Sequence, residues 1–320
     1  MYRGTLLSLI LVFCGSTLTL AQPGNWPSRP VTLIVPFVIG GASDTVARLL
    51  APELSAVIGQ PVVVKNWAGA GGSIAARQLT RLAPDGHVLM FAGLSETVLI
   101  PLSQPTAGYS PQDLQPIFIV GSTPLALAVR TKFPAHDIDS WVQIARANPM
   151  KFSYGSNGLG SYGHLMLQTL AHRLGLEMLH VPYKGSSQML NDLAGGQIDL
   201  ALVSLPSVLP YVNSDKVKLL GVSSATRMVD TGQTPTFHES SALAPYQISV
   251  WGGIFAPQAI PDEVAVRINT AFALVLRNSK IREGLIRIGA QPDQPRSLSE
   301  SRLFFMRQIE QFHPLTSHPR

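Results

Sequence analysis

The sequence predicts an α/β fold made of two layered domains. Three observations support this prediction: apolar runs alternate with helical patterns, glycine-rich loops follow several of those runs, and the chain has 320 residues. Near-continuous apolar runs are typical of buried parallel strands, and strands that alternate with helices form layers with right-handed crossovers. At about 100–200 residues per domain, the length suggests two domains or one large one.

Between residues 31 and 92 the pattern predicts three strands and two helices. The expected strands span residues 31–37, 61–64 and 87–92, and the expected helices span residues 45–57 and 73–82. Pro52 falls inside the first helix, where an interior proline costs about 3 kcal/mol. We therefore expect a kink there, or a helix that restarts at that point.

A second set of elements repeats this plan with a different sequence, so no internal repeat is inferred. The expected strands span residues 117–120, 126–129, 152–155, 178–182, 198–203, 217–222 and 248–255. The expected helices span residues 138–147, 161–174, 187–194 and 260–278, the last with Pro261 in its first turn.

The composition excludes several classes of protein. Hydrophobic residues make up 46% of the chain, which is enough for a core and rules out global disorder. The net charge of +5 is dispersed, with no block of five or more like charges, which argues against a nucleic-acid partner. One cysteine rules out a disulfide framework and a cysteine-ligated metal. We expect no metal and no cofactor.

The first 21 residues have the features of a signal peptide. Arg3 supplies a positive charge, residues 6–13 form a short apolar run, and Thr19-Leu20-Ala21 suits cleavage. The run is too short to span a bilayer as a stable helix, although an N-terminal anchor remains the alternative. Cleavage would remove Cys14 and leave a cysteine-free chain suited to an oxidising compartment. No later stretch reaches 18 apolar residues, so we expect a soluble exported protein.

Two glycine-rich loops share one physical design. Residues 40–43 (Gly-Gly-Ala-Ser) and residues 156–161 (Ser-Asn-Gly-Leu-Gly-Ser) each lie between an expected strand and an expected helix. The first N–H groups of a helix are unpaired and carry partial positive charge, so such an end binds carboxylate or phosphate without Lys or Arg. Ser43 and Ser161 occupy the expected cap positions. The alternative for either loop is ordinary N-capping with glycine in a tight turn.

The second loop also matches a dinucleotide-binding pattern at residues 158–163. That function would need an acidic residue at the end of the next strand, where Tyr183 and Lys184 stand instead. Lys184 leaves an NADP enzyme open as a minor alternative. A G-x-S-x-G elbow, an H-E-x-x-H motif and a P-loop are all missing from the sequence.

Three further side chains have two interpretations each. His164 lies in the first turn after the second loop and could contact a ligand or pack as a satisfied histidine. His180, inside an apolar strand, is more typical of a core residue. Asp44 and Arg48 are four residues apart, so they predict an ion pair that steadies the helix start. The functional alternative is that Asp44 orients the first glycine loop.

Taken together, several blocks resemble the Bug/TctC family of exported receptors of tripartite tricarboxylate transport systems. The blocks run in family order across nearly the whole mature chain. They are residues 26–30 (WPSRP), 35–37 (VPF) with 40–41 and 43–44, Asn66 with 69–72 (GAGG), 83–86 (APDG), 154–156 (YGS) with Gly158 and Gly160, 180–185 (HVPYKG), 195–196 with Asp199, and 255–257 (FAP).

The resemblance implies a two-lobed periplasmic-binding-protein fold that closes on its ligand like a Venus flytrap. Residues 22–122 and 248–320 would form lobe 1, and residues 123–247 would form lobe 2. Two strand crossings, near Ser122 and near Val250, would form the hinge. The anion loops, one from each lobe, would then face each other across the cleft.

The resemblance also implies a periplasmic, monomeric and non-catalytic receptor that delivers a small carboxylate to a membrane permease. Family members bind such ligands partly through ordered waters, which cost little enthalpy. The expected ligand-binding residues are Phe37, Gly40, Gly41, Ser43, Asp44, Asn66, Ala70, Ser156, Asn157, Gly158, Gly160, Ser161, His164 and Ser204. A sensor that presents the ligand to a signalling partner would share this fold.

The chain departs from the family pattern in and after the second anion loop. The family often has a Pro and a Thr-Ser pair around this loop, where this chain has Asn157, Tyr162 and Gly163. The bulky Tyr162 could narrow the cleft or stack on a ligand. Where family members often place an Asp-Asn pair, the chain has Val203 and Ser204. Because a partner for an ammonium group is lost there, we expect a ligand without an amino group.

An exported α/β enzyme, a hydrolase or an oxidoreductase, is the alternative from a different class. An enzyme needs a nucleophile within hydrogen-bond reach of its base. Ser156 or Ser204 bonded to His164 in a deep cleft would favour it.

Overall fold

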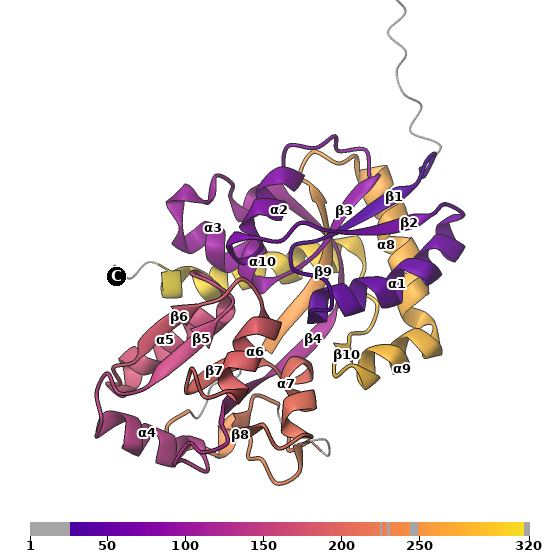
Figure 1. Ribbon diagram of the computed structural model, residues 1–320. Coiled ribbons are helices and arrows are strands. Elements are labelled where there is room, and N and C mark those ends of the chain that lie inside the picture. Colours follow the sequence, from indigo (N-terminus) through magenta and orange to yellow (C-terminus); the bar gives the residue numbers. More distant parts are fainter. Residues whose placement is uncertain (1–25, 225, 229–230, 244–248, 317–320) are drawn as a thin grey trace, which may run out of the picture.

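The computed structural model describes residues 26–224, 226–228, 231–243 and 249–316 (Figure 1). The predicted signal peptide and Cys14 lie outside these residues. The described part contains ten strands in one sheet: β1 (Val31–Val35), β2 (Val62–Asn66), β3 (Val88–Gly93), β4 (Leu114–Arg130), β5 (Ser153–Ser156), β6 (Leu179–Pro182), β7 (Leu200–Ser204), β8 (Val217–Val222), β9 (Ser249–Pro257) and β10 (Gln291–Pro292).

The helices lie between these strands and after them. They are α1 (Ala42–Ile58), α2 (Ser73–Leu79), α3 (Ile100–Ser103), α4 (Ile138–Arg146), α5 (Tyr162–Leu174), α6 (Ser186–Ala194), α7 (Leu205–Val212), α8 (Asp262–Arg277), α9 (Ser279–Arg287) and α10 (Leu298–Thr316). A π-helical turn, η2 (Ser95–Leu99), precedes α3, and short 3-10 turns include η1 (Ala70–Gly72) and η6 (Phe237–Glu239). The α/β class predicted from the sequence is confirmed. In the described part of the chain, none of the helices combines the length and apolarity needed to cross a bilayer.

The strands follow in the order β2-β1-β3-β9-β4-β7-β5-β6, with β8 and β10 also paired to β4. β1, β2 and β3 are parallel, as are β5, β6 and β7, whereas β9 runs antiparallel between β3 and β4. The carboxyl ends of the parallel strands therefore carry the glycine-rich loops, which is where open α/β sheets bind ligands.

Strand β4 corrects one prediction from the sequence. We expected separate strands at 117–120 and 126–129, but β4 is one strand of 17 residues. It pairs with β9 as far as Pro124 and with β7 from Leu125 onward. Proline has no N–H to donate to a ladder, and Pro124 lies where β4 exchanges partners. The same strand thus belongs to both halves of the molecule.

The first half buries apolar side chains on both faces of its sheet. Helices α1 and α8 cover one face, where Leu50 and Phe272 are almost fully buried and Phe118 stacks on Phe272 at a centroid separation of 6.0 Å. Helix α10 covers the other face, with Phe305 against Phe255 at 5.2 Å. Helices α10 and α3 and the turn η2 were not among the elements predicted from the sequence.

The second half has the same layered plan. Helices α6 and α7 bury Leu193 and Val208 on one face. Helices α4 and α5 bury Trp141 and Leu167 on the other, in an apolar cluster that continues into the α10 side of the first half through Trp251. The two halves are therefore joined by packed side chains as well as by the two crossing strands.

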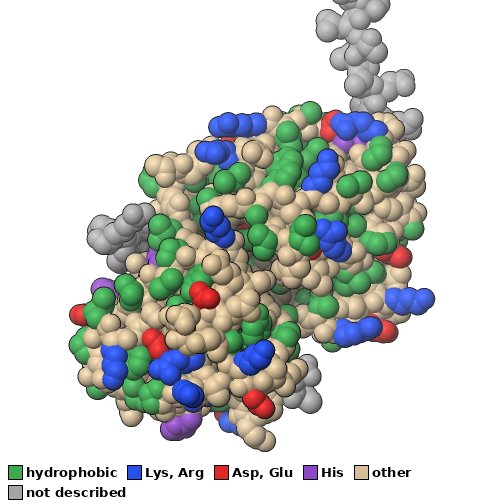
Figure 2. All heavy atoms as spheres, in the orientation of Figure 1, with side chains coloured by type: hydrophobic (Ala, Val, Ile, Leu, Met, Phe, Trp, Pro, Cys, Tyr) green, Lys and Arg blue, Asp and Glu red, His purple; other side chains and the backbone are tan. Residues whose placement is uncertain are grey.

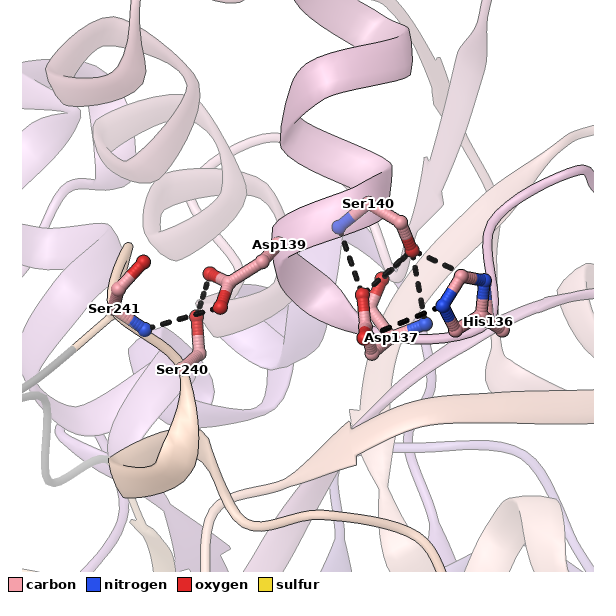
Figure 3. Close-up of polar contacts among 6 residues, drawn as sticks. All are labelled: His136, Asp137, Asp139, Ser140, Ser240 and Ser241. Atoms are coloured by element: carbon pink, nitrogen blue, oxygen red, sulfur yellow. Dashed lines mark hydrogen bonds and ion pairs between the residues drawn. The ribbon is translucent and has the colours of Figure 1, made fainter.

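The chain returns from the second half to the first beside the start of α4. The Asp139 carboxylate accepts hydrogen bonds from the Ser240 hydroxyl at 2.7 Å and from the backbone N–H groups of Ser241 and Ala242, both at 3.2 Å (Figure 3). The Ser240 bond is the main reason that the pKa of Asp139 lies below its ordinary value. This carboxylate fixes the segment that leads back towards β9.

The proline predictions have mixed outcomes. Helix α1 is one element of 17 residues with Pro52 inside it, so the expected restart is wrong. Pro261 lies at the N-cap position of α8, one residue before the first turn in which it was expected.

Candidate ligand-binding site

The first glycine loop, residues 37–41, is held by one buried carboxylate. Asp44 is only 2% exposed, and its Oδ2 accepts from the backbone N–H of Gly40 at 2.9 Å and from Arg48 Nε at 2.8 Å. Burial would raise the pKa of Asp44, but the bonds from Arg48, Gly40 and Asn66 hold that pKa below its ordinary value. The predicted ion pair is confirmed, and the same carboxylate also orients the loop.

Asn66, at the end of β2, ties the second glycine loop to the first. Its Nδ2 donates to the carbonyl of Phe37 at 3.0 Å and to Asp44 Oδ1 at 2.9 Å. Its Oδ1 accepts from Arg48 Nη2 at 3.2 Å. Asn66 therefore belongs to the bracing of both loops, because it is bonded to the backbone of one and follows directly into the other.

The prediction that Ser43 caps α1 is wrong. The N-cap residue is Gly41, in an extended conformation with φ −74°, and no side chain caps this helix end. Ser43 lies inside the first turn and is half-buried. The consequence favours binding, because the N–H groups of the first turn have no side-chain acceptor and are available to an anion or water.

The glycine loop that follows Asn66, here called the second loop, takes its shape from positive φ angles at four successive residues, 69–72. Ala70 is the only non-glycine among them, at φ +46°. At Gly72 a side chain would also collide with Glu96, since an added Cβ would lie 2.9 Å from the Glu96 Cβ. The loop thus turns tightly against the end of β3.

The third loop, residues 156–161, is the second of the two anion loops predicted from the sequence. Hydrogen bonds from its own serine hydroxyls close it. Ser161 caps α5 as predicted, because its Oγ accepts from the N–H of His164 at 3.4 Å. The same Oγ donates to the Gly158 carbonyl at 2.7 Å. Ser156 Oγ also lies 3.2 Å from the N–H of Gly158, which donates to it. In contrast to α1, the start of α5 carries its own cap.

Two imidazoles that contact each other at a tilt brace the third loop from inside the second half. His164 Nδ1 accepts from the N–H of Gly160 at 3.2 Å, and His180 Nε2 lies 2.7 Å from Ser156 Oγ. The two rings have centroids 4.2 Å apart. Burial lowers the pKa of His180, which keeps it neutral. His164 therefore packs within the loop, and His180 is a half-buried brace that the sequence had assigned to the core.

The serine–histidine contact differs from the one that an enzyme would need. Ser156 bonds His180 rather than His164, and Ser156 is only 1% exposed. Ser204 Oγ donates to Ser207 Oγ at 3.0 Å. A second Ser–His contact, Ser28 with His87, has the histidine Nε2 already occupied by the N–H of Ser28 at 3.2 Å. None of these contacts presents an activated, accessible nucleophile.

The loops of the two halves touch each other. A Cβ added at Gly158 would lie 3.7 Å from the backbone nitrogen of Gly71, which is van der Waals contact, so the two loops lie against each other. We call this line of contact between the two halves the seam. Across it, Gln104 Nε2 donates to the Leu159 carbonyl at 2.8 Å, and the N–H of Tyr162 donates to Ser95 Oγ at 2.9 Å. Figure 2 shows the surface hollowed along this seam, with scattered Lys and Arg rather than a basic cluster.

Tyr162 reaches further into the second half than its backbone bond suggests. Its hydroxyl accepts from the N–H of Ser204 at 3.2 Å, at the end of β7. Burial is the main reason that its pKa rises to about 12. Tyr162 is thus fixed at both ends, by Ser95 across the seam and by Ser204 within its own half, and it occupies space beside the expected site.

Glu96 lies near the site and was not selected from the sequence. It is 2% exposed, and its Oε1 accepts from the N–H of Gly93 at 2.6 Å. Burial raises its pKa to about 7, although hydrogen bonds from Gly93 and its own N–H act in the opposite direction. It lies against Gly72 and next to Ser95, behind the seam. Glu96 stands out because its carboxyl group is buried, and the burial of a single glutamate cannot be predicted from its residue type.

The structure joins most of the predicted site residues into two hydrogen-bonded units, one in each half. Phe37, Gly40, Asp44 and Asn66 form one bonded unit in the first half, while Ser156, Gly158, Gly160, Ser161 and His164 form another in the second. Asn157 bonds the Ser186 hydroxyl at 3.1 Å. Among the described residues, no group of three or more His, Cys, Asp or Glu side chains could hold a metal ion.

Comparison with known proteins identifies relatives of this architecture. Residues 46–315 match the family model described as the tripartite tricarboxylate transporter family receptor. The protein BugT of Bordetella pertussis is 32% identical over 292 residues, covering 90% of this chain and 89% of BugT. Two solved structures superpose on 91% of this chain with TM-scores of 0.84. One, from R. palustris and solved with adipate, is 32% identical over 97% of its length. The other, MatC from Rhodopseudomonas palustris with bound malate, is 28% identical over its full length.

Proposed function

This chain belongs to the tripartite tricarboxylate transporter family of receptors, and on that premise we propose that it binds a small organic carboxylate between two lobes. The family consists of periplasmic solute-binding proteins. One observation supports the proposal most: the start of α1 has no side-chain cap, while its loop is held rigid by Asp44. Such a helix end binds an anion with unpaired N–H groups.

The proposed lobes are those expected from the sequence, residues 22–122 with 248–320 and residues 123–247. The exchange of partners on β4 at Pro124 supports a boundary there. The contacts of Gly71 with Gly158 and of Ser95 with Tyr162 support a closed arrangement, in which the loops of the two lobes meet. The hinge would lie where β4 and β9 cross.

Within this cleft, the first loop would hold the carboxylate. The first turn of α1 would present unpaired backbone N–H groups and the Ser43 hydroxyl, with Gly40 and Gly41 leading into it and Phe37, Asn66 and Ala70 beside it. The loop that contains Asn157, Gly158 and Gly160 would close from the second lobe, with Ser204 behind Tyr162. Asp44 and His164 would act by fixing the two loops, since both are engaged by loop N–H groups.

The ligand would be a mono- or dicarboxylate without an amino group. The relatives solved with adipate and malate support the dicarboxylate class. A ligand ammonium group needs an acceptor carboxylate, but the Asp44 carboxylate is already bonded by Gly40, Arg48 and Asn66. Burial holds Glu96 partly protonated near neutral pH, which makes it a poor partner for a cation.

We further propose export to the periplasm with cleavage near Ala21, a monomeric state, and delivery of the ligand to the membrane subunits of a tripartite tricarboxylate transporter. No catalytic step is proposed, because Ser156 is buried and bonded within its own loop.

Thermal unfolding in the presence of adipate, malate, succinate, aspartate and benzoate tests the ligand class. A ligand at 100 times its Kd adds about 2.7 kcal/mol of stability, which is several degrees for a chain of this size. We expect a shift with a dicarboxylate and a smaller one with aspartate than with succinate. A larger shift with aspartate would contradict the proposed class.

Gly41→Phe tests the site. Gly41 has φ −74° and an added Cβ would lie 3.3 Å from the Val38 carbonyl oxygen, so the backbone tolerates a side chain that obstructs the loop. Gly195→Phe is a matched control, because Gly195 has φ −77° and the same 3.3 Å contact with a carbonyl, that of Asn191. We expect the ligand-induced shift to disappear only in Gly41→Phe. An unchanged shift in both variants would refute this site.

A further inference from the structure

A cavity lies between the two halves, away from the three glycine loops. Its volume is about 460 Å³, and none of residues 37–44, 66–72 or 156–164 lines it. Its wall includes Pro124 on β4, Trp251 on β9, Ser223 after β8, and three glutamines, two of them on α10. Both crossing strands thus contribute to it. The volume is within the range of small-molecule sites.

One side of this cavity is aromatic. Trp251 and Phe312 are 5% and 6% exposed, and Phe304 meets Trp251 edge-on with centroids 5.4 Å apart. The guanidinium of Arg296 lies over the Phe304 ring at 4.7 Å. These surfaces favour an apolar or aromatic body in the ligand.

Two of the glutamines on the wall have a fixed hydrogen-bond direction. The Trp251 indole can only donate, and it donates to Gln308 Oε1 at 2.8 Å. This orients Gln308 so that its Nε2 donates to Gln311 Oε1 at 3.3 Å. The chain of bonds therefore ends in the Gln311 amide nitrogen, which can only donate.

Two other groups on the wall also keep hydrogen-bond donors. Ser223 Oγ accepts from the N–H of Leu125 at 2.7 Å, which leaves its own hydroxyl hydrogen to donate. Arg296 donates Nε and Nη2 to the single oxygen Oδ2 of Asp293, at 3.1 and 2.9 Å, so its remaining N–H groups keep their donor capacity. The carboxylate of Asp293 is the acidic group on the wall, and Arg296 offsets it.

We propose that this hinge cavity binds a second organic acid, a monocarboxylate with an apolar or aromatic body. Its body packs on Trp251 and Phe304, and its carboxylate accepts from Gln311 and Arg296. A sugar or polyol would need acceptors as well as donors, whereas the Asp293 carboxylate on this wall is engaged by Arg296 and the other oriented groups donate. Because the cavity touches both crossing strands, its occupancy and the affinity of the cleft are linked, and the coupling is reciprocal.

Calorimetric titration with benzoate, and with benzyl alcohol as its uncharged analogue, tests the proposal. Gln311→Glu places a negative charge at the outer end of the bond chain, on an exposed helix position that tolerates it. Gln78→Glu, exposed on α2 and outside the cavity, is the matched control for added charge. Gly41→Phe blocks the proposed cleft without altering the hinge.

We expect benzoate to bind Gly41→Phe within twofold of the unaltered protein, and Gln311→Glu to weaken that binding by about tenfold or more, because a donor is replaced by a charge of the same sign as the ligand's. Gln78→Glu should leave it unchanged, and benzyl alcohol should bind at least tenfold more weakly. Binding lost in Gly41→Phe but kept in Gln311→Glu would place benzoate in the cleft and overturn the proposal. Equal binding of benzyl alcohol, or no benzoate binding at about 10 mM, would also overturn it. The dicarboxylate test of the cleft succeeds or fails independently.

Discussion

The loops that begin α1 and α5 are both held rigid by side chains, but only one of the two helix ends is capped. Both present a helix N-terminus to the seam between the halves. The α1 loop is braced by the charged Asp44 and left without a cap, while the α5 loop is braced by two imidazoles and capped by Ser161. An uncapped end can give its N–H groups to a ligand, and a capped end has already used one of them. We infer that α1 supplies the anion site and that α5 supplies a shaped lid.

Removal of the charged brace should give the largest effect. Asp44→Ala leaves the Gly40 N–H and the Asn66 amide without their acceptor, so we expect a loss of about 3 kcal/mol in the free energy of unfolding. Ligand affinity should fall with it. Denaturant titration and calorimetry measure both quantities. Ligand affinity that survives in a folded Asp44→Ala protein would show that the α1 loop does not hold the anion.

The acid dependence of this contribution has a defined sign. Because the folded state lowers the pKa of Asp44, its stabilisation is present above the unfolded value of 3.8 and is lost as pH falls below it. The α1 loop should therefore keep its shape throughout the neutral range.

Glu96 sharpens the comparison, because it is a buried carboxyl beside the seam and, unlike Asp44, it has no Arg or Lys bonded to it in the described structure. Its pKa rises from 4.5 to about 7, so its contribution to stability is complete below pH 4.5 and is lost as pH rises through 7. We expect a loss of roughly 2 kcal/mol between pH 5 and pH 8. Denaturant titration across this range should show a flatter profile in Glu96→Gln. The same slope in both proteins would assign the pH dependence to another group.

Removal of the cap on α5 should have a smaller effect than removal of the charged brace. Ser161→Ala should cost about 1 kcal/mol, the usual value for a lost N-cap. Its ligand affinity should change less than that of Asp44→Ala, because the α5 end serves as the lid. Ser43→Ala is the control for stability alone, since Ser43 is inside the first turn of α1 and caps nothing. A greater loss of affinity in Ser161→Ala than in Asp44→Ala would reverse the roles of the two loops.

The seam itself should give the smallest effect. Gln104→Ala removes one exposed hydrogen bond, to the Leu159 carbonyl, and should change stability by about 0.5 kcal/mol. Ligand affinity should fall two- to threefold, because the closed arrangement loses one contact between the halves. Small-angle scattering without ligand should show a slightly larger radius of gyration. An unchanged affinity would show that this bond does not contribute to closure.

The sequence was sufficient to predict the α/β class, the three loops and the Asp44–Arg48 pair. Those features depend on residue type and spacing: glycine between strand and helix, and opposite charges four residues apart. The sequence was insufficient where the role of a residue depends on its backbone conformation. Ser43 looks like a cap by composition, but the cap position belongs to the extended Gly41.

The remaining differences also have physical causes. Gly121, Ser122 and Pro124 interrupt the apolar pattern, so β4 reads as two strands, although pairing with β9 carries the strand through them. Glu96 and His180 could not be selected, because their roles depend on burial and on neighbours far along the chain. The cavity beside Trp251 is formed by segments from residues 122 to 312, which no local pattern brings together.

The position of β9 has a consequence for the order in which the molecule can fold. β9 separates β3 from β4 in the sheet, yet it is made only after residue 248. Until it is present, the early strands β1 to β3 have an open edge, and β4 lacks the partner that carries it between the halves. A growing chain therefore stays incomplete for three quarters of its length, and the sheet closes in one late step when β9 inserts.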